Sequence, residues 1–442
     1  MRTKVFTMAA AMLACLVSTG VLHAAPAIQH WQTDKGTRVY FVPAPELPMV
    51  DIRMLFAAGS AHDDGQHGLA SLTNGLLDDG AAGLTANDIA DQLEGLGANL
   101  VTGALRDSAW VSLRSLSNPA QLEPAIDLMS KIISQPDFNQ RDFERERERN
   151  LVALRRSEQQ PSSVADYRFF EAVYGDHPYA TRPIGTAESL QKIKLKDVRP
   201  YYEKYYVARN AIIAIVGDVD RKGAERLASQ LTGQLPAGEA APRTPVVPPL
   251  SQVAEQRIHH PSTQTTVRMG GPGMHRGDPD YFTLYVGNHV LGGGGLVSRL
   301  FIEVRDKRGL SYGVNSYFTP MAQDGPYIFG LQTRNDQADE ALDVMRSILK
   351  EFHDKGPTDA ELTASKKNIT GGFPLRINSN SKIVEYLGMI GFYNLPLDYL
   401  DTFNDRVMAV TREQIIDAYQ RRVHPDNMVT VIVGGDGGEK TQ

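Results

Sequence analysis

The amino-acid sequence predicts two similar domains, each built from both strands and helices, and three observations support this prediction. The chain has 442 residues, of which 42% are hydrophobic, and this is enough material for more than one core. Residues 236–250 read PAGEAAPRTPVVPPL, a proline-rich stretch that is typical of an extended linker. On either side of it, a strand, a helix-rich middle and a closing strand follow one another in the same order.

The first domain is expected to span residues 25–235 and to begin with an apolar strand in VDIRMLFAAGS. A helix follows from Leu69, where leucines recur at helical spacing. Two further helices are predicted over residues 117–136 and 140–161. The alternating charges of the second helix suit a solvated helix face. The strand Asn210–Val219 closes the domain.

The second domain is expected to span residues 251–442 and to repeat this plan. Its first strand is TTVRMGGPGM, its next helix is PDYFTLYVGNHVLG, and its closing strand is Asn427–Asp436. A unit of about 200 residues is too long for a solenoid repeat. Duplication of one α/β domain is therefore the simpler interpretation.

The N-terminus has the three parts of a secretory signal. Arg2 and Lys4 precede an apolar run from Val5 to Val17, and small residues near Ala24 offer a cleavage site. Residues 1–24 are therefore interpreted as a signal peptide, and the mature chain is expected in the periplasm of a Gram-negative cell. The apolar run is short for a membrane anchor, and no later segment is long and apolar enough to span a membrane.

Cysteine content and net charge exclude several classes of function. Cys15 is the only cysteine, so a mature chain that starts after residue 24 has no disulfide and no thiolate metal site. The sequence MLAC that ends at Cys15 leaves a lipoprotein site as an alternative. Lys and Arg total 46 against 52 Asp and Glu, a balance that indicates neither nucleic acid nor an anionic membrane as partner.

One face of the helix that starts at Leu69 is unusually bare. Ser71, Asn74 and Gly75 share this face, and a glycine inside a helix costs about 1 kcal/mol relative to alanine. None of the three supplies a charge or an imidazole. The neighbouring face of the same helix is strongly apolar.

Several motifs, taken in order, resemble the insulinase and pitrilysin family of zinc peptidases. They are GSAHDDGQHGLA followed by LLDDG, then ERERN, then GDHPYATRPIGTAESL, and finally SRLFIEVRDKRGLSYGVNSYF. The resemblance spans nearly the whole mature chain and is greatest to half-length bacterial enzymes similar to the mitochondrial processing peptidase. It implies an α+β fold of two homologous domains, each a mostly antiparallel sheet with helices, which form half of a clamshell around an unfolded peptide.

The resemblance also implies that this chain has lost its zinc site. Peptidases of the family carry His-x-x-Glu-His on the first helix, where two His bind zinc and the Glu serves as general base. In this chain Ser71 and Gly75 stand at the two ligand positions, and Asn74 stands at the base. The third ligand, a glutamate of the ERER helix, aligns with Arg155 if Glu146 and Glu148 match the family's preceding pair, and the charge of Arg155 is fixed and positive. No metal ligand is therefore expected in this chain, and zinc is expected in a partner subunit.

The second domain retains a pair that the family uses in catalysis. Arg305 and Tyr312 match the Arg and Tyr that, in the resembling enzymes, donate hydrogen bonds to peptide carbonyls and to the developing oxyanion. Donors of this kind are each worth about 10²- to 10³-fold in rate. The alternative is that Tyr312 is a core aromatic and Arg305 a solvated helix charge.

Two other stretches attract attention. The glycines Gly292, Gly293, Gly294 and Gly295 lack the Gly-Lys-Ser/Thr that a phosphate-binding loop requires. They are interpreted as a flexible turn, and the resemblance implies that this turn lies near bound substrate, where it lets the backbone approach a peptide closely. The polar cluster at residues 62–67 is better explained by turn chemistry than by a metal.

Two functions from different classes follow. In the first, the chain is the non-catalytic subunit of a heterodimeric zinc peptidase and lends Arg305 and Tyr312 to a homologous subunit that bears the zinc motif. In the second, it is a pseudopeptidase that serves as a peptide-binding or structural subunit without hydrolysis. The sequence does not favour activity of the chain alone, and it leaves the substrate sequence, the identity of the partner and homodimer formation open.

Overall fold

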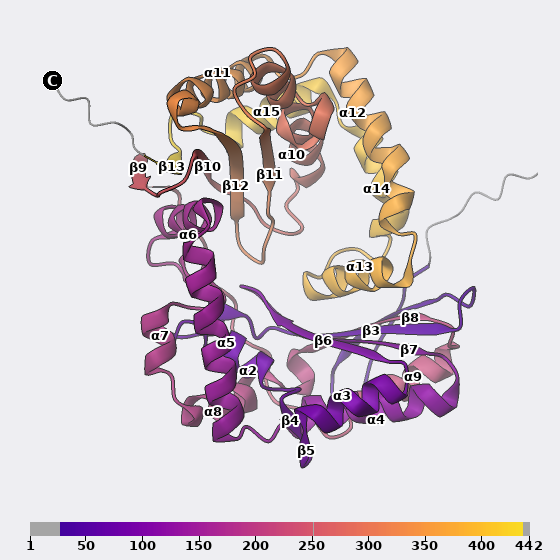
Figure 1. Ribbon diagram of the computed structural model, residues 1–442. Helices are drawn as coiled ribbons and strands as arrows, with labels where there is room; N and C mark the ends of the chain where they lie inside the picture. The colour runs from indigo at the N-terminus through magenta and orange to yellow at the C-terminus, as the bar shows by residue number, and fades with distance from the viewer. Residues whose placement is uncertain (1–26, 251, 436–442) are drawn as a thin grey trace, which may run out of the picture.

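The computed structural model describes residues 27–250 and 252–435 and shows two units, one above the other, that meet on both sides of the view (Figure 1). The N-terminal unit, indigo to magenta, lies below, and the C-terminal unit, largely orange to yellow, lies above. The predicted signal peptide at residues 1–24 lies outside the described residues. Within the described residues, none of the helices combines the length and the apolar character that crossing a bilayer requires.

The N-terminal unit is built on a six-stranded sheet with the order β1-β2-β8-β3-β7-β6. Strands β2 and β8 are parallel, and the other neighbours are antiparallel. Its strands are β1 (Gln29–Gln32), β2 (Arg38–Pro43), β3 (Met49–Phe56), β6 (Asn99–Ala104), β7 (Ala109–Leu116) and β8 (Ala211–Gly217), with a separate hairpin of β4 (Gly80–Ala81) and β5 (Leu84–Thr85).

Helices of the N-terminal unit cover the lower face of this sheet and extend up its left side in Figure 1. They are α2 (Leu69–Gly75), α3 (Ala86–Gly95), α4 (Pro119–Ser134), α5 (Gln140–Glu158), α6 (Pro161–Tyr174), α7 (Ala187–Lys192), α8 (Leu195–Tyr205) and α9 (Arg221–Thr232), with short 3₁₀ turns η1 (Ser60–His62), η2 (Pro178–Ala180) and η3 (Ala208–Asn210). The two helices predicted from the sequence over residues 117–136 and 140–161 correspond to α4 and α5. Helix α5 ends three residues before Pro161, which begins α6.

The C-terminal unit is built on a five-stranded sheet with the order β11-β12-β10-β13-β9, in which only β13 and β9 are parallel. Its strands are β9 (Ala254–His259), β10 (Gln264–Met274), β11 (Gly313–Phe318), β12 (Gly325–Arg334) and β13 (Val429–Gly434). Its helices are α10 (Tyr281–Asn288), α11 (Ala338–Lys355), α12 (Asp359–Gly372), α13 (Asn380–Phe392), α14 (Tyr399–Ala409) and α15 (Arg412–Arg422). Between α10 and α11 lie the π-helices η4 (His289–Gly293) and η6 (Phe301–Asp306) and the 3₁₀ turns η5 (Gly295–Val297) and η7 (Asn335–Gln337), and η8 (Phe373–Arg376) follows α12.

Five strands of the N-terminal sheet repeat in the C-terminal sheet, and only β1 has no counterpart. The series β2-β8-β3-β7-β6 has the same directions as the series β9-β13-β10-β12-β11, including one parallel pair followed by antiparallel pairs. Helix α10 then corresponds to α2, and the edge strand β11 corresponds to the edge strand β6. The α+β fold of two similar units, each with a mostly antiparallel sheet, is therefore confirmed. The predicted helix over residues 279–292 is α-helical only to Asn288 and continues as the π-helix η4.

Each unit contributes a helix to the sheet of the other. Helix α13 packs on β2, β3 and β8 of the N-terminal sheet, whereas α6 packs on β10 and β13 of the C-terminal sheet. Gly391 allows α13 to approach closely, because a Cβ at this position would overlap Ile212, 2.8 Å away. Alternate residues of β8 face the two cores, so Ile212 packs under α13 and Ile213 packs in the N-terminal core. This burial on both faces explains the continuous apolar run in NAIIAIVG.

The proline-rich segment at residues 236–250 forms neither helix nor strand, and hydrogen bonds hold it against both units. The carbonyl oxygen of Pro245 lies 2.9 Å from His177 Nε2 in the N-terminal unit. The carbonyl oxygen of Thr244 accepts from Gln323 Nε2 in the C-terminal unit at 3.0 Å. The segment is therefore extended, as the sequence predicts, and is also fixed in place.

A buried carboxylate joins the two units beside this segment. Asp107, in the turn between β6 and β7, is only 5% exposed. It accepts hydrogen bonds from the Tyr179 hydroxyl at 2.5 Å, from the Tyr393 hydroxyl at 3.0 Å and from the Ala322 amide at 2.8 Å. The last two donors belong to the C-terminal unit, so one side chain of the first unit holds two segments of the second.

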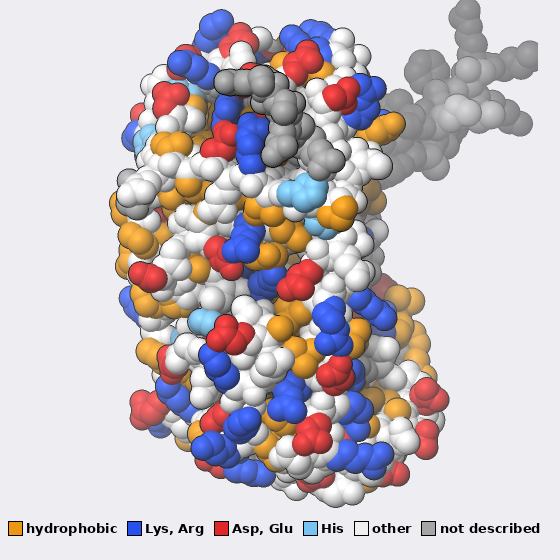
Figure 2. All heavy atoms as spheres, turned by 60° about the vertical axis from the view of Figure 1, so that its left-hand side comes forward, with side chains coloured by type: hydrophobic (Ala, Val, Ile, Leu, Met, Phe, Trp, Pro, Cys, Tyr) orange, Lys and Arg blue, Asp and Glu red, His pale blue; other side chains and the backbone are white. Residues whose placement is uncertain are grey.

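The face that carries α6 has mixed surface chemistry. Figure 2 shows acidic and basic side chains interspersed there, with apolar groups between them. No single sign of charge dominates this face, which agrees with the small net charge of −6. Nucleic acid is therefore not favoured as a partner on this face.

Candidate functional site

The bare helix of the sequence is α2, and its start is fixed by turn chemistry. The buried side chain of Asp63 accepts from the amides of Gly68 at 2.7 Å and Ala70 at 2.8 Å, which are free at the helix start. Gly68 has φ of +100°, a conformation that favours glycine. Residues 62–67 therefore act as the turn that the sequence predicts, and this turn determines the direction in which α2 projects Ser71, Asn74 and Gly75.

Two of these three positions are filled or blocked by neighbouring side chains. Asn74 is 1% exposed, and its amide donates to the Tyr206 hydroxyl at 3.2 Å. Gly75 faces Glu146 of α5, so a Cβ on Gly75 would overlap the carboxylate, with Glu146 Cδ 2.9 Å away. Ser71, one turn before Gly75, is partly buried. The face that lacks ligands is thus packed against α5.

Arginines occupy the surroundings of Glu146. Arg149 Nε donates to Glu146 Oε2 at 2.5 Å, and Arg149 Nη2 lies 3.3 Å from Asp79. Arg145 binds the same Asp79 at 3.1 Å. Burial raises the pKa of Glu146, whereas the Arg149 guanidinium opposes this rise and favours the carboxylate. Glu146 is the one charged residue of α5 that is buried, whereas the sequence predicts that the charged face of this helix is solvated.

This donor set does not fit a zinc ion. Zinc sites use three or four His, Cys, Asp or Glu ligands. Here Gly75 has no side chain, Asn74 offers only a neutral amide oxygen, and the single facing carboxylate, Glu146, is already paired with Arg149. A cation at this point would meet the positive charges of Arg145 and Arg149.

Arg155, aligned by the sequence with the third ligand, lies on the other side of α5. Its guanidinium pairs with Glu148 at 2.7 Å, and both side chains are exposed. Nine residues separate Glu146 from Arg155, which is about two and a half helical turns, so the two side chains point in opposite directions. The alternating ERERER pattern gives no signal for which Glu faces α2, and only the packing of α5 on α2 reveals it.

We expect Gly75→Ala to lower the free energy of unfolding by about 1–3 kcal/mol, because the added methyl group displaces Glu146 and disturbs its pairing with Arg149. Urea unfolding followed by tryptophan fluorescence measures the change. Gly95→Ala is the matched control, since Gly95 also ends a helix and has open space at its Cβ. The control should be neutral or slightly stabilising. Equal stability of Gly75→Ala and wild type would contradict the steric explanation.

An edge strand runs next to α2. Strand β6 is the last strand of its sheet, pairs on one side with β7 and contacts α2. Val101 on this strand is 52% exposed. An edge strand presents unpaired backbone donors and acceptors, which can pair with an extended peptide.

The four glycines Gly292 to Gly295 end η4 and begin η5, and three of them are shaped by their own neighbours. A Cβ on Gly292 would lie 2.6 Å from the backbone nitrogen of Ser316, and one on Gly294 would lie 2.6 Å from the His289 carbonyl oxygen. A Cβ on Gly293 would meet Asn288 at 2.7 Å. Only Gly295, with φ of +61°, has open space around it. Internal packing therefore explains much of the glycine content, and most of the segment belongs to the helical turns η4 and η5.

An ion pair fixes the segment that follows these glycines. Arg299 donates to both oxygens of Glu361, at 2.6 and 2.7 Å. Glu361 also caps α12 by accepting from Thr358. Burial acts to raise the pKa of Glu361, but the hydrogen bonds from Arg299 and Thr358 outweigh it and lower the pKa to about 2.

This pair makes stability depend on pH in a defined direction. Because the folded-state pKa of Glu361 lies below its ordinary value of 4.5, the stabilisation is complete above about pH 5 and is lost as pH falls toward 2. Allowing for partial exposure, we expect Glu361→Gln to cost about 1–2 kcal/mol at pH 7 and less at pH 3. Urea unfolding at both pH values measures this difference. Glu351→Gln, which affects an exposed pair with Lys355, is the control, and an equal cost of Glu361→Gln at both pH values would contradict the prediction.

Arg305 and Tyr312 both reach solvent. Arg305 lies in η6, exposed, with its guanidinium 4.7 Å from the centre of the Phe301 ring. Tyr312 immediately precedes the edge strand β11 and is 71% exposed. The alternative that Tyr312 is a core aromatic is therefore wrong. Both side chains have donors available to a bound molecule.

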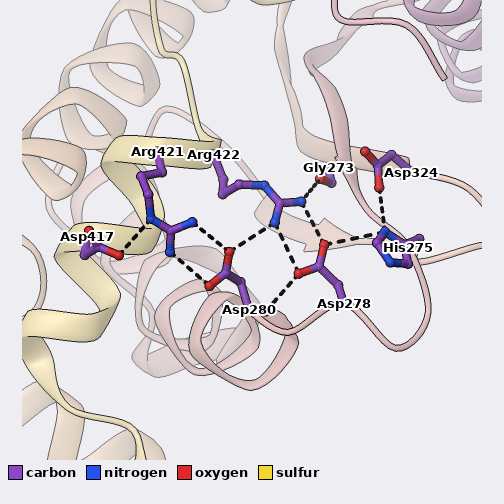
Figure 3. Close-up of polar contacts among 8 residues, drawn as sticks. All are labelled: Gly273, His275, Asp278, Asp280, Asp324, Asp417, Arg421 and Arg422. Carbon is purple, nitrogen blue, oxygen red and sulfur yellow. Dashed lines mark hydrogen bonds and ion pairs between the residues drawn. The ribbon is translucent and has the colours of Figure 1, made fainter. Parts of the chain in front are cut away.

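A cluster that sequence reasoning missed lies in the C-terminal unit (Figure 3). His275 Nδ1 is 3.0 Å from Asp324 and 3.6 Å from Asp278, and within the described ranges this is the one group of His, Asp and Glu that could surround a metal ion. Arg422, however, already binds Asp278 through both guanidinium Nη atoms, at 2.8 and 3.2 Å. Arg422 also binds Asp280 at 3.1 Å. We interpret the cluster as an ion-pair network that closes the end of α15 onto the start of α10.

Family models match both units. One described as "Insulinase (Peptidase family M16)" matches residues 38–187, and one described as "Peptidase M16 inactive domain" matches residues 192–369. Among solved structures, a peptidase M16 inactive domain from Pseudomonas fluorescens is 39% identical, with a TM-score of 0.90, and the match covers 93% of this chain and 99% of that one. A protease from Helicobacter pylori shares the fold, with a TM-score of 0.85 at 20% identity over 92% of this chain and 99% of that one.

Named relatives differ in what their names say about catalysis. A protein of Helicobacter pylori named "Non-peptidase homolog YmxG" is 27% identical over 399 residues, which cover 89% of this chain and 91% of the relative. A Bacillus subtilis protein named "Uncharacterized zinc protease YmxG" is 22% identical over 358 residues, which cover 80% of this chain and 86% of the relative.

Proposed function

Because the chain belongs to the M16 family of insulinase-type peptidases, we propose that it is the non-catalytic subunit of a heterodimeric zinc metallopeptidase. In this proposal the zinc and the general base belong to a homologous partner subunit. This chain contributes Arg305 and Tyr312 to the binding of an unfolded peptide and to stabilisation of the transition state. The signal-like sequence of residues 1–24 supports the periplasm as the location of this complex.

The contrast between the two units carries this proposal. Around α2, the positions of a zinc site hold Ser71, Asn74 and Gly75, and Arg149 pairs with the facing Glu146. In the C-terminal unit, the stretch SRLFIEVRDKRGLSY is complete and presents Arg305 and Tyr312 to solvent. If the whole chain had lost its role in catalysis, the half of the shared active site that holds Arg305 and Tyr312 would not be expected to stay complete and exposed.

The edge strand β6 adds support for a peptide as ligand. It lies beside α2, and its outer edge offers backbone groups to an extended chain. A peptide bound there needs no metal to be held. This observation also fits the alternative, in which the chain binds peptides or supports a complex without hydrolysis, as the name of the Helicobacter pylori relative suggests for that protein.

Reconstitution distinguishes the two functions. The purified chain alone should hold less than 0.1 equivalent of zinc by metal analysis and should cleave no unfolded peptide, because the α2 site offers no fitting donor set. Mixed with a homologous subunit that carries His-x-x-Glu-His, it should form a heterodimer with peptidase activity that neither subunit shows alone. If the heterodimer forms but is no more active than the partner alone, the binding or scaffold function is correct instead.

A further inference from the structure

A cavity of about 240 Å³ in the C-terminal unit is lined by basic and hydroxyl groups. It lies between α10, the edge strand β11 and η8. Arg276 and Arg376 contribute to its lining, together with Tyr281, Tyr285 and Tyr317. Within the described part of the chain, neither Asp nor Glu lines this cavity. In a protein with a net charge of −6, this concentration of positive charge is unusual.

Arg276 has no acidic partner to balance its charge. It lies in the turn between β10 and α10, where its backbone amide donates to the Met321 carbonyl oxygen at 2.8 Å. Among the described residues, its side-chain Nε is buried without a hydrogen-bond acceptor, and no carboxylate lies within 4.0 Å of its guanidinium. An unsatisfied buried donor costs about 1–3 kcal/mol, more when it is charged. The Nη atoms of the same guanidinium are not buried in this way and donate no hydrogen bond within the described residues, so they are the donors that a ligand in the cavity can meet.

Arg376, at the end of η8, carries the second unbalanced charge. Its Nη1 donates to the Tyr285 hydroxyl at 2.9 Å, and in the part of the chain that is described it has no carboxylate partner. Burial raises the pKa of Tyr285, so the hydroxyl stays protonated and its own proton is free to be donated. Elsewhere in this unit, buried or partly buried arginines are paired, as Arg299 is with Glu361 and Arg422 with Asp278.

We infer that this cavity binds a carboxylate group of a peptide, held by the guanidinium groups of Arg276 and Arg376 with the Tyr285 hydroxyl as a further donor. Arginine suits this role because its planar donors match the two oxygens of a carboxylate. That the carboxylate belongs to a peptide rests on the proposed function. Strand β11, which lines the cavity, begins one residue after Tyr312. A chain that reaches Tyr312 and continues along this edge strand passes the cavity.

The carboxylate can come from a C-terminus or from an acidic side chain, and four synthetic peptides of one neutral sequence separate these sources. Two differ only in having a C-terminal acid or a C-terminal amide. The other two have blocked ends and differ only in an internal Glu or Gln. Fluorescence anisotropy with the purified chain measures each Kd. At least one acid should bind about 10- to 100-fold more tightly than its neutral counterpart, as expected for charged hydrogen bonds.

Arginine variants locate the site. Arg276→Gln and Arg376→Gln should each reduce the preference for the acid peptide to less than threefold. Arg346→Gln is the matched control, because its guanidinium lies on α11 and already pairs with Glu255 at 3.1 Å, and it should retain the preference. Thermal melting confirms that the variants fold, and Arg376 lies at the surface, so its replacement should leave the fold intact.

Equal binding of acid and neutral peptides, a preference that persists in both arginine variants, or the absence of binding by all four peptides would overturn the inference. The test uses the chain alone and measures no hydrolysis. An inactive heterodimer together with a clear acid preference would therefore refute the proposed catalytic role and leave the carboxylate site standing. An active heterodimer without an acid preference would support the proposed catalytic role and refute the carboxylate site.

Discussion

Arg305→Ala or Tyr312→Phe in this chain should lower kcat of the reconstituted heterodimer by about 10- to 1000-fold, the range expected when a donor to the transition state is removed. The physical reason is that both side chains reach solvent, where their N–H and O–H groups can approach the carbonyl oxygen of a bound peptide as it gains negative charge. KM should change less than kcat, because the donors matter most in the transition state. Steady-state kinetics with an unfolded peptide measures both constants.

Two controls make this prediction specific. Size-exclusion chromatography of each variant with the partner shows whether assembly is retained, and zinc analysis shows that the partner keeps its metal. Lys307→Ala is the matched variant, because Lys307 is exposed two residues after Arg305 and pairs with Glu303 at 2.7 Å, and it should leave kcat within about twofold of wild type, as expected for an exposed pair. If both site variants assemble and cleave at the wild-type rate, the shared site does not exist.

Asp107→Ala should lower the free energy of unfolding by about 2–5 kcal/mol, the largest effect on stability that we expect from a single substitution. The variant leaves the hydroxyls of Tyr179 and Tyr393 and the amide of Ala322 without their common acceptor in a buried place. Burial is the main cause of the raised pKa of both tyrosines and persists without Asp107, so neither hydroxyl can relieve the loss by ionising. Urea unfolding of the full chain measures the cost.

The control variants separate charge from hydrogen bonding. Asp107→Asn retains one acceptor oxygen and should cost less than Asp107→Ala. Asp127→Ala, which breaks an exposed pair with Lys131, should change stability by about 0.5 kcal/mol or less. A cost of similar size for Asp127→Ala and Asp107→Ala would show that the junction between the units contributes little.

The sequence was sufficient to predict the plan of the fold, and the reason lies in periodicity. The continuous apolar run of β8 and the helical spacing of leucines after Leu69 are local signals. The order of strands and helices recurs in both halves, and this recurrence indicated duplication before any contact was known. The same signals fail at residues 279–292, because the switch from α-helix to π-helix at His289 depends on how the glycines pack against β11.

The parts that could not be predicted depend on contacts between distant residues. Asp107 stands in a polar turn that looks solvated, and it becomes buried only because Ala322 and Tyr393, more than 200 residues later, close over it. Similarly, which Glu of ERERER faces α2 is decided by the rotation of α5 against Gly75. The cavity around Arg276 and Arg376 also joins residues about 100 positions apart, so no motif in the sequence could indicate it.

The exchange of α6 and α13 between the two sheets has a consequence for biosynthesis. When the ribosome has completed the N-terminal unit, one face of its sheet, with Tyr40 and Ile212, still lacks the helix that covers it. That helix, α13, ends at Phe392, so about nine-tenths of the polypeptide must be made before this face can be closed. Apolar strands left open in this way invite aggregation. A chain of this design therefore gains from delaying the completion of its N-terminal unit until α13 is available, so that both cores close together.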